Sequence, residues 1–102
     1  TTQARQQSEY FQRNMEKLGI KIRINNNTWP ELSDKVHRNK HQIYAMAWSA
    51  DYPDAENFLG LLYCPNKNPG SNGANYCDAS FDQKFKQATL MQHSQERTSL
   101  YE

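Results

Sequence analysis

The sequence is poor in apolar residues. Hydrophobic residues fill 36% of its 102 positions, and the mean hydropathy is −1.04. No apolar run approaches the ~20 residues of a membrane-spanning helix. A chain of this length forms one domain at most, and its composition predicts a small core with a thin margin of stability.

The chain also lacks an excess of charge of either sign. Twelve Lys and Arg stand against eleven Asp and Glu, which gives a formal net charge of +1. The cations are scattered, and this argues against a nucleic-acid-binding surface. Aromatic residues are plentiful at 12%, so the composition indicates a folded domain rather than a disordered one.

Cysteine is scarce, since Cys64 and Cys77 are the only two. They are not spaced as C-x-x-C, and His37, His41 and His93 show no metal-ligand spacing around them. Counting cysteines favours a disulfide that closes the loop between them, and hence an oxidising compartment. The alternative is two free thiols in a reducing cytosol. We predict no metal and no other cofactor.

Signatures of catalysis are missing too. Asp51 and Asp54 could be drawn as a carboxylate pair, but this spacing before a helix is also typical of capping residues. His37 and His41 could bind a metal if one helix carried both, yet no third ligand is apparent. The glycines form no phosphate-binding fingerprint. The sequence therefore predicts a binding protein rather than an enzyme.

The N-terminal half predicts a helix and a strand, then a second such pair. Gly19 ends the first helix, and Ile alternates with basic residues at 20–24, as in a strand with one buried face. A capping box that starts at Thr28 begins a surface helix to about Arg38. The apolar run at 43–48 suits a strand buried on both faces. One face of the first helix carries Ala4, Phe11, Met15 and Leu18.

The C-terminal half is predicted to be helical around a long loop. Residues 63–78 show no periodicity. Ser80 and Gln83 match a second capping box, whose helix runs to about His93, and Ser94 caps a short last helix. The apolar side of the helix before the loop carries Phe58, Leu59 and Leu62.

The predicted fold class is therefore α/β, in the order helix, strand, helix, strand, helix, loop, helix, helix. Residues 1–102 would form a single partial domain, and both ends look cut. Because two parallel strands alone are not a stable sheet, neighbouring strands are expected from the rest of a larger chain or from a second copy.

The turn after the second predicted strand is the best candidate for a ligand site. In open α/β sheets, ligands bind beyond the carboxyl ends of the strands. An indole and a carboxylate at this turn, from Trp48 and Asp51, could hold a small organic cation such as an α-ammonium group. The alternative is that Asp51 or Asp54 caps the next helix and that Trp48 lies in the core.

Four segments carry a resemblance: LGIKIRIN at 18–25, TWPEL at 28–32, MAWSADYPDAENFL at 46–59 and YCPNKNPGSN at 63–72. In order and spacing they resemble the family 5 extracellular solute-binding proteins. These include the dipeptide- and oligopeptide-binding components of ABC importers. The resemblance continues to the end of the chain.

The resemblance implies a type II periplasmic-binding fold with two lobes, of which this chain is part of one, without the hinge or the opposite lobe. It implies that Asp51 receives the α-ammonium group of a peptide, with Trp48, Ser49 and Ala50 bordering the ligand, while Asp54 keeps a capping role. It also implies delivery to an ABC permease from the periplasm, or from outside the cell as a membrane-anchored lipoprotein.

Two features leave alternatives open. Cys64 and Cys77 stand where we expect other residues in the family, and their joint appearance supports a disulfide. Family members also carry non-peptide ligands. The competing function is an interaction piece that self-associates, for instance as a dimer, through exposed apolar surface and unpaired strand edges.

Overall fold

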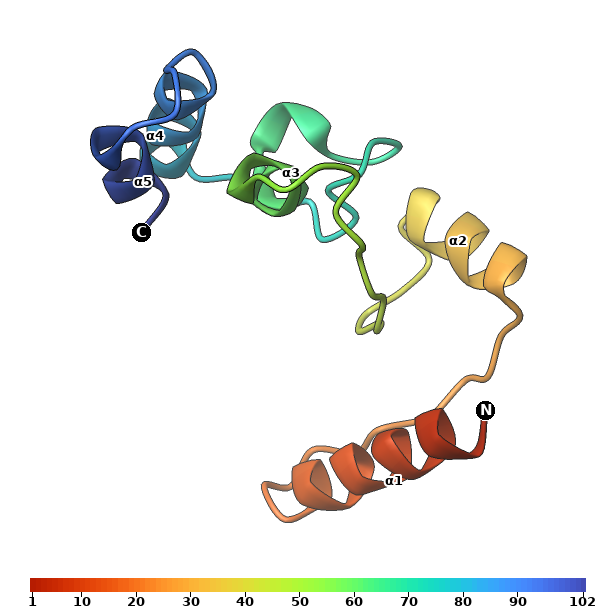
Figure 1. Cartoon of the computed structure of the whole chain (residues 1–102). Helices are drawn as coiled ribbons and strands as arrows, with labels where there is room; N and C mark the ends of the chain where they lie inside the picture. The colour runs from red at the N-terminus through yellow and green to blue at the C-terminus, as the bar shows by residue number, and fades with distance from the viewer.

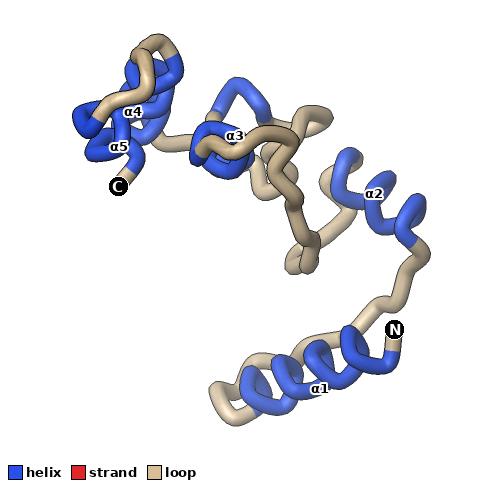
Figure 2. The backbone as a smooth tube through the Cα atoms, viewed as in Figure 1, coloured by secondary structure: helices blue, strands red, loops and turns tan.

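The computed structural model describes all 102 residues, and it consists of helices joined by turns and irregular segments (Figures 1 and 2). Outside the helices, the one β-type pairing is an isolated bridge between Lys67 and Asn72. None of the helices combines the length and apolar character of a membrane span. The helical elements are α1 (Thr2–Glu16), α2 (Trp29–His37), α3 (Ala55–Leu59), the 3-10 helices η1 (Gly60–Leu62) and η2 (Cys64–Asn66), α4 (Ala79–Thr89) and α5 (Gln95–Tyr101).

A glycine turn follows α1, as the sequence predicts. The amide of Ile20 donates to the Met15 carbonyl at 3.1 Å, and the amide of Gly19 donates to the Glu16 carbonyl at 2.9 Å. This pair of bonds is a Schellman motif, which places its C′ residue in the left-handed region. Gly19 adopts φ +78° there, without the clash that a Cβ would bring.

The two predicted strands do not form. Residues 20–24 and 43–48 lie in irregular backbone and pair with no neighbouring strand. A strand persists only where its N–H and C=O groups pair with those of a neighbour, and this chain provides none. The Ile22 carbonyl instead accepts a hydrogen bond from Gln12 Nε2 at 2.7 Å, which holds the segment beside α1. Ile43 is 65% exposed rather than buried.

α2 begins at its predicted cap. The Glu31 carboxylate accepts hydrogen bonds from the amide and the hydroxyl of Thr28 at 2.7 and 2.9 Å. These bonds favour the ionised form, so they lower the pKa of Glu31. The helix ends at His37 and buries only Val36, consistent with the predicted surface helix.

Other helix boundaries differ from the prediction. Asp78, not Ser80, caps α4, because its carboxylate accepts the Phe81 amide at 2.7 Å. An ionised carboxylate also interacts favourably with the helix dipole, which a serine hydroxyl does only weakly. α4 ends at Thr89 rather than near His93. The predicted third helix is α-helical for one turn only and then tightens into η1.

The packed part of the molecule lies where α4 meets α5 and α3. Phe85 and Ala88 of α4 are 8% and 0% exposed. The ring centroid of Phe85 lies 4.8 Å from that of Tyr63, 6.0 Å from that of Phe81 and 6.5 Å from that of Tyr101. This aromatic cluster is the small core that the composition predicts.

The long loop at 63–78, for which the sequence predicts no regular structure, is folded around asparagine side chains. Asn72 is 0% exposed. Its Nδ2 donates to the Tyr63 and Tyr76 carbonyls at 3.2 and 2.8 Å, and its Oδ1 accepts the Tyr76 amide at 3.2 Å. Asn68 Nδ2 donates to a carbonyl of α2 at 2.8 Å, which docks the loop on that helix.

The chain is extended for its length. Its radius of gyration is 16.8 Å, against about 13 Å for a compact domain of this size. In both views of the whole chain α1 stands apart from the group formed by α3, α4 and α5 (Figures 1 and 2). Large apolar side chains consequently remain uncovered, among them Leu18 and Leu90 at 74% and 81% exposure.

Candidate functional site

The predicted ligand-binding turn leads from irregular backbone into α3. Trp48 is 45% exposed, and Ser49, Ala50 and Asp51 are exposed as well. α3 begins after Asp54, whose Oδ1 accepts the Glu56 amide at 2.9 Å. The capping role predicted for Asp54 is therefore confirmed, and Asp51 is not the cap.

Asp54 has a second partner that the sequence did not reveal. Arg97 Nη1 and Nη2 donate to its two carboxylate oxygens at 2.8 and 3.0 Å. This paired geometry is the strong form of a charge-assisted hydrogen bond. It is the main reason that the pKa of Asp54 is lowered, with the Glu56 amide as the second cause.

Arg97 is itself enclosed, with 9% of its side chain exposed. Its Nε donates to the Ala88 carbonyl at 2.9 Å, and its Nη2 donates to the Tyr101 hydroxyl at 3.1 Å. Burial raises the pKa of Tyr101, so this hydroxyl stays protonated. Arg97 thus ties the start of α3 to the end of α4 and to α5, across 43 residues of sequence.

The two aspartates of the turn therefore have separate environments. Both oxygens of Asp54 are bound to a guanidinium, which rules out a shared-proton carboxylate pair with Asp51. Asp51 has no Lys, Arg or His nitrogen within 4.0 Å. It is an exposed carboxylate without a cation.

Asn57, on α3, links Trp48 to Asp51. Its Oδ1 accepts the indole Nε1–H of Trp48 at 2.8 Å and the amide of Asp51 at 3.2 Å. Its Nδ2 donates to Asp51 Oδ2 at 3.5 Å, the longest of these contacts. Asn57 was not predicted from the sequence. The available signal was its position as the third residue of a helix that starts after a capping aspartate. An amide side chain at this position can reach back to the preceding turn.

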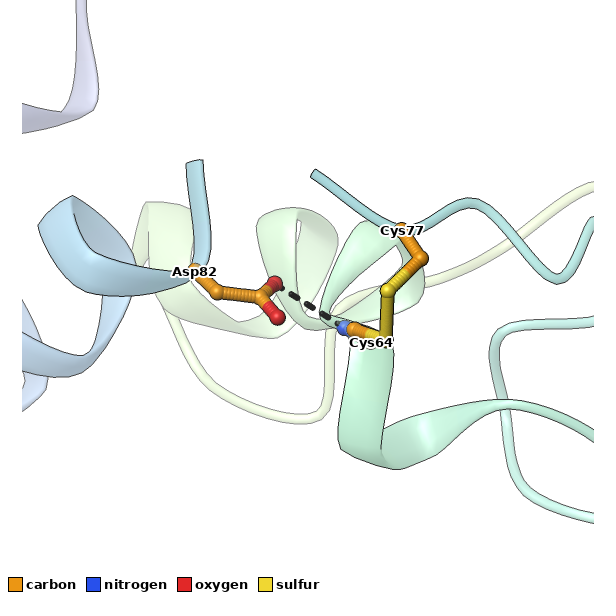
Figure 3. A group of neighbouring side chains, drawn as sticks. All are labelled: Cys64, Cys77 and Asp82. Atoms are coloured by element: carbon orange, nitrogen blue, oxygen red, sulfur yellow. Dashed lines mark hydrogen bonds between the residues drawn. A yellow bond between two sulfur atoms is a disulfide. The ribbon is translucent and has the colours of Figure 1, made fainter. Parts of the chain in front are cut away.

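Cys64 and Cys77 form a disulfide, with their Cα atoms 4.5 Å apart (Figure 3). The predicted pairing is confirmed. Asp82 lies beside it and accepts the Cys64 amide at 3.0 Å (Figure 3). The three side chains gather their sulfur and oxygen atoms within 4.8 Å, but sulfurs that are bonded to each other are not thiolate ligands for a metal.

The histidines do not converge. α2 ends at His37, so the helix that would bring His37 and His41 onto one face stops too early. His37 Nδ1 lies 3.4 Å from Ser33 Oγ. The ring of His41 packs edge-on against Tyr44, with centroids 4.6 Å apart.

Comparison with known proteins shows the family to which the chain is similar. Residues 1–70 match the family described as bacterial extracellular solute-binding proteins, family 5, middle region. Di/tripeptide-binding protein 3 of Pseudomonas aeruginosa (strain UCBPP-PA14) is 32% identical over 98 residues, which is 96% of this chain and 18% of that protein. The dipeptide-binding protein of Escherichia coli (strain K12) is 28% identical over 99 residues, again 96% of this chain and 18% of the relative.

The oligopeptide-binding protein OppA of Bacillus subtilis (strain 168) is 30% identical over 83 residues, 81% of this chain and 15% of its own length. The chain thus spans less than a fifth of the length of these relatives. No solved structure matches it with significance. Since the family match covers more than half of its residues, the chain belongs to the family 5 bacterial extracellular solute-binding proteins.

Proposed function

We propose that the chain is part of one lobe of an extracytoplasmic peptide-binding protein, in which Asp51 binds the α-ammonium group of the peptide. The single observation that carries this proposal is the division between the two aspartates of the turn. Arg97 neutralises Asp54. Asp51 has no cation near it and stands next to a half-exposed indole.

An α-ammonium group would complete this arrangement. It brings one positive charge and up to three N–H donors, and the Asp51 carboxylate can accept them. The Trp48 ring would exclude water from one side, which strengthens the attraction between the two charges. Ser49 and Ala50 would border the ligand through their exposed backbone. No reacting group is needed, because the proposed action is recognition and release, not catalysis.

The α/β architecture is part of the same proposal. Residues 20–24 and 43–48 keep the composition of strands, and in this chain they pair with no neighbouring strand. Strands from the remainder of a two-lobed type II protein would pair with them and cover the exposed Ile43. The proposed partners are a peptide ligand and the ABC permease that receives it. The proposed location is the periplasm, or the cell exterior for a lipid-anchored form, and the disulfide is consistent with either.

Self-association is the second candidate, and the exposed apolar side chains favour it. Trp29 is 65% exposed and Leu90 is 81% exposed. Uncovered surface of this kind can join two copies of a chain. The two readings differ in a simple way: a self-associating piece needs no peptide, and Asp51 would have no part in it.

Calorimetric titration of the full-length gene product tests the proposal. Di- to pentapeptides are compared with the same peptides acetylated at the N-terminus, in the wild-type protein and in Asp51→Asn. We expect acetylation and the substitution each to weaken binding by more than ~2 kcal/mol, and expect no further loss when they are combined. Asp34→Asn is the matched control, because Asp34 is an exposed carboxylate in a surface pair with Arg38 and should leave binding unchanged.

Equal binding of free and acetylated peptides would remove the ammonium site. Absence of binding by any peptide, together with concentration-dependent dimerisation, would support the self-association reading instead. Binding of a non-peptide solute that ignores Asp51→Asn would keep the transport role and discard the proposed anchor.

A further inference from the structure

Asn57 is the one side chain that hydrogen-bonds to both Trp48 and Asp51. Its Oδ1 accepts two hydrogen bonds, from the Trp48 indole at 2.8 Å and from the Asp51 amide at 3.2 Å. The Asp51 amide lies six residues before Asn57 in the sequence, and the Trp48 indole lies nine residues before it. One oxygen therefore fixes both the ring orientation and the backbone of the turn.

The position of Asn57 gives it this reach. It lies in the first turn of α3, and the Asn57 amide donates to the Asp54 carbonyl at 3.2 Å. Asp54 is held in turn by Arg97, which is anchored on α4 and α5. Asn57 thus stands on the best-secured part of this region, while Trp48 and Asp51 stand on irregular backbone that has no such support.

The remaining contact concerns charge. Asn57 Nδ2 lies 3.5 Å from Asp51 Oδ2, a weak contact at the limit of hydrogen-bond distance that leaves the carboxylate charge uncompensated. An amide is suited to this position, since a lysine or arginine in its place would supply the cation that the proposed ligand brings. An aspartate in its place would keep the acceptor and lose the donor.

We infer that Asn57 is a positioning residue that sets Trp48 and Asp51 in the geometry required to discriminate a free α-ammonium group from a capped one. The inference rests on the proposed function of Asp51. A group held in place before binding loses less conformational freedom when the ligand arrives, so the benefit of Asn57 appears as selectivity and affinity together.

The test combines two measurements on the full-length gene product. The first is the ratio of dissociation constants for an N-acetylated and a free tripeptide. The second is ¹⁹F NMR of ligand-free protein labelled with fluorotryptophan, in which the Trp48 signal is assigned by its loss in Trp48→Phe. Asn57→Ala removes all three contacts, and Asn57→Asp keeps the two acceptor bonds.

In Asn57→Ala we expect the ratio to fall at least tenfold and the Trp48 signal to move towards that of a solvent-exposed indole. In Asn57→Asp we expect the Trp48 signal to stay in place and the free peptide to remain preferred. An unchanged ratio in Asn57→Ala overturns the inference, and so does an Asn57→Asp protein that loses selectivity as completely as Asn57→Ala. If Asn57→Ala does not fold, the Asn57→Asp result decides alone.

These outcomes separate the inference from the function beneath it. If wild-type protein does not distinguish free from acetylated peptide, the proposed role of Asp51 fails, whatever the variants do. If wild-type protein discriminates and Asn57→Ala does so equally, Asp51 keeps its role and Asn57 is merely part of α3.

Discussion

Arg97 binds Asp54 through two parallel hydrogen bonds of 2.8 and 3.0 Å, and the same carboxylate caps α3. One side chain therefore serves a helix terminus and a long-range ion pair. The arrangement leaves Asp51 as the uncompensated carboxylate of the same turn.

Acid should destabilise the protein partly through Asp54. Its pKa is lowered in the folded state from an ordinary value of 3.8, so its contribution is complete above about pH 4 and is lost as the pH falls through the lower folded value. Asp54→Asn should lower the free energy of unfolding at neutral pH by about 2 kcal/mol. It should also reduce the loss of that free energy as the pH falls below about 4. Urea unfolding of the full-length gene product at a series of pH values measures both effects.

Glu31→Gln is the companion variant, because the pKa of Glu31 is also lowered, by a cap remote from Arg97. Glu31→Gln should leave intact the contribution of Asp54 to the loss of stability in acid. If the free energy of unfolding of Asp54→Asn depends on pH as it does in the wild-type protein, Asp54 does not contribute to the loss of stability in acid.

Arg97→Lys should destabilise the protein although the charge is kept. A lysine ammonium cannot make two parallel bonds to Asp54 while also donating to the Ala88 carbonyl. We expect a fall in melting temperature of roughly 2–4 °C. Arg38→Lys is the control, since Arg38 makes an exposed pair with Asp34 and the change should have little effect. Equal shifts for the two variants would show that the enclosed geometry of Arg97 is unimportant.

Removing the disulfide should cost about 3 kcal/mol, the value expected from chain entropy for a loop of this length. The bond joins residues 13 apart in sequence. Cys64→Ser combined with Cys77→Ser should therefore shift the urea midpoint to lower concentration, and a reductant should do the same to the wild-type protein only. A wild-type midpoint that ignores the reductant would contradict this expectation.

Asn72→Ala should be among the more damaging single changes in the loop. It would leave the Tyr63 and Tyr76 carbonyls and the Tyr76 amide without their partner in a buried site. Unpaired buried groups of this kind cost about 1–3 kcal/mol each before relaxation, so we expect a total loss of about 2–4 kcal/mol. Ser71→Ala, at the exposed neighbouring position, should be nearly neutral in the same unfolding measurement.

Local signals in the sequence predicted the features that depend on neighbours in the chain. The Gly19 stop and the Thr28 and Ser94 caps need only a few residues each. The Cys64–Cys77 pairing followed from the presence of two cysteines, and the structure contains all four features. The cap of α4 was misplaced because two side chains two residues apart, Asp78 and Ser80, could serve, and the ionised one does.

Long-range relationships escaped prediction for a physical reason. Nothing near Asp54 indicates that Arg97 will reach it across 43 residues, and an asparagine such as Asn57 has no periodic signature. The two strand predictions were wrong for a different reason. Their local pattern is clear, but a sheet requires partners, and residues 20–24 and 43–48 have none within this chain.

The separation of the two carboxylates also bears on how such a turn can change over evolutionary time. Because Asp54 carries the ion pair and the helix cap, a substitution at Asp51 breaks no salt bridge and removes no cap. In the proposed binding mode, the charge offered to a ligand can therefore be altered at Asp51 while Asp54 maintains the architecture three residues away. A scaffold built in this way can acquire a new cargo by single substitutions that selection for folding would hardly notice.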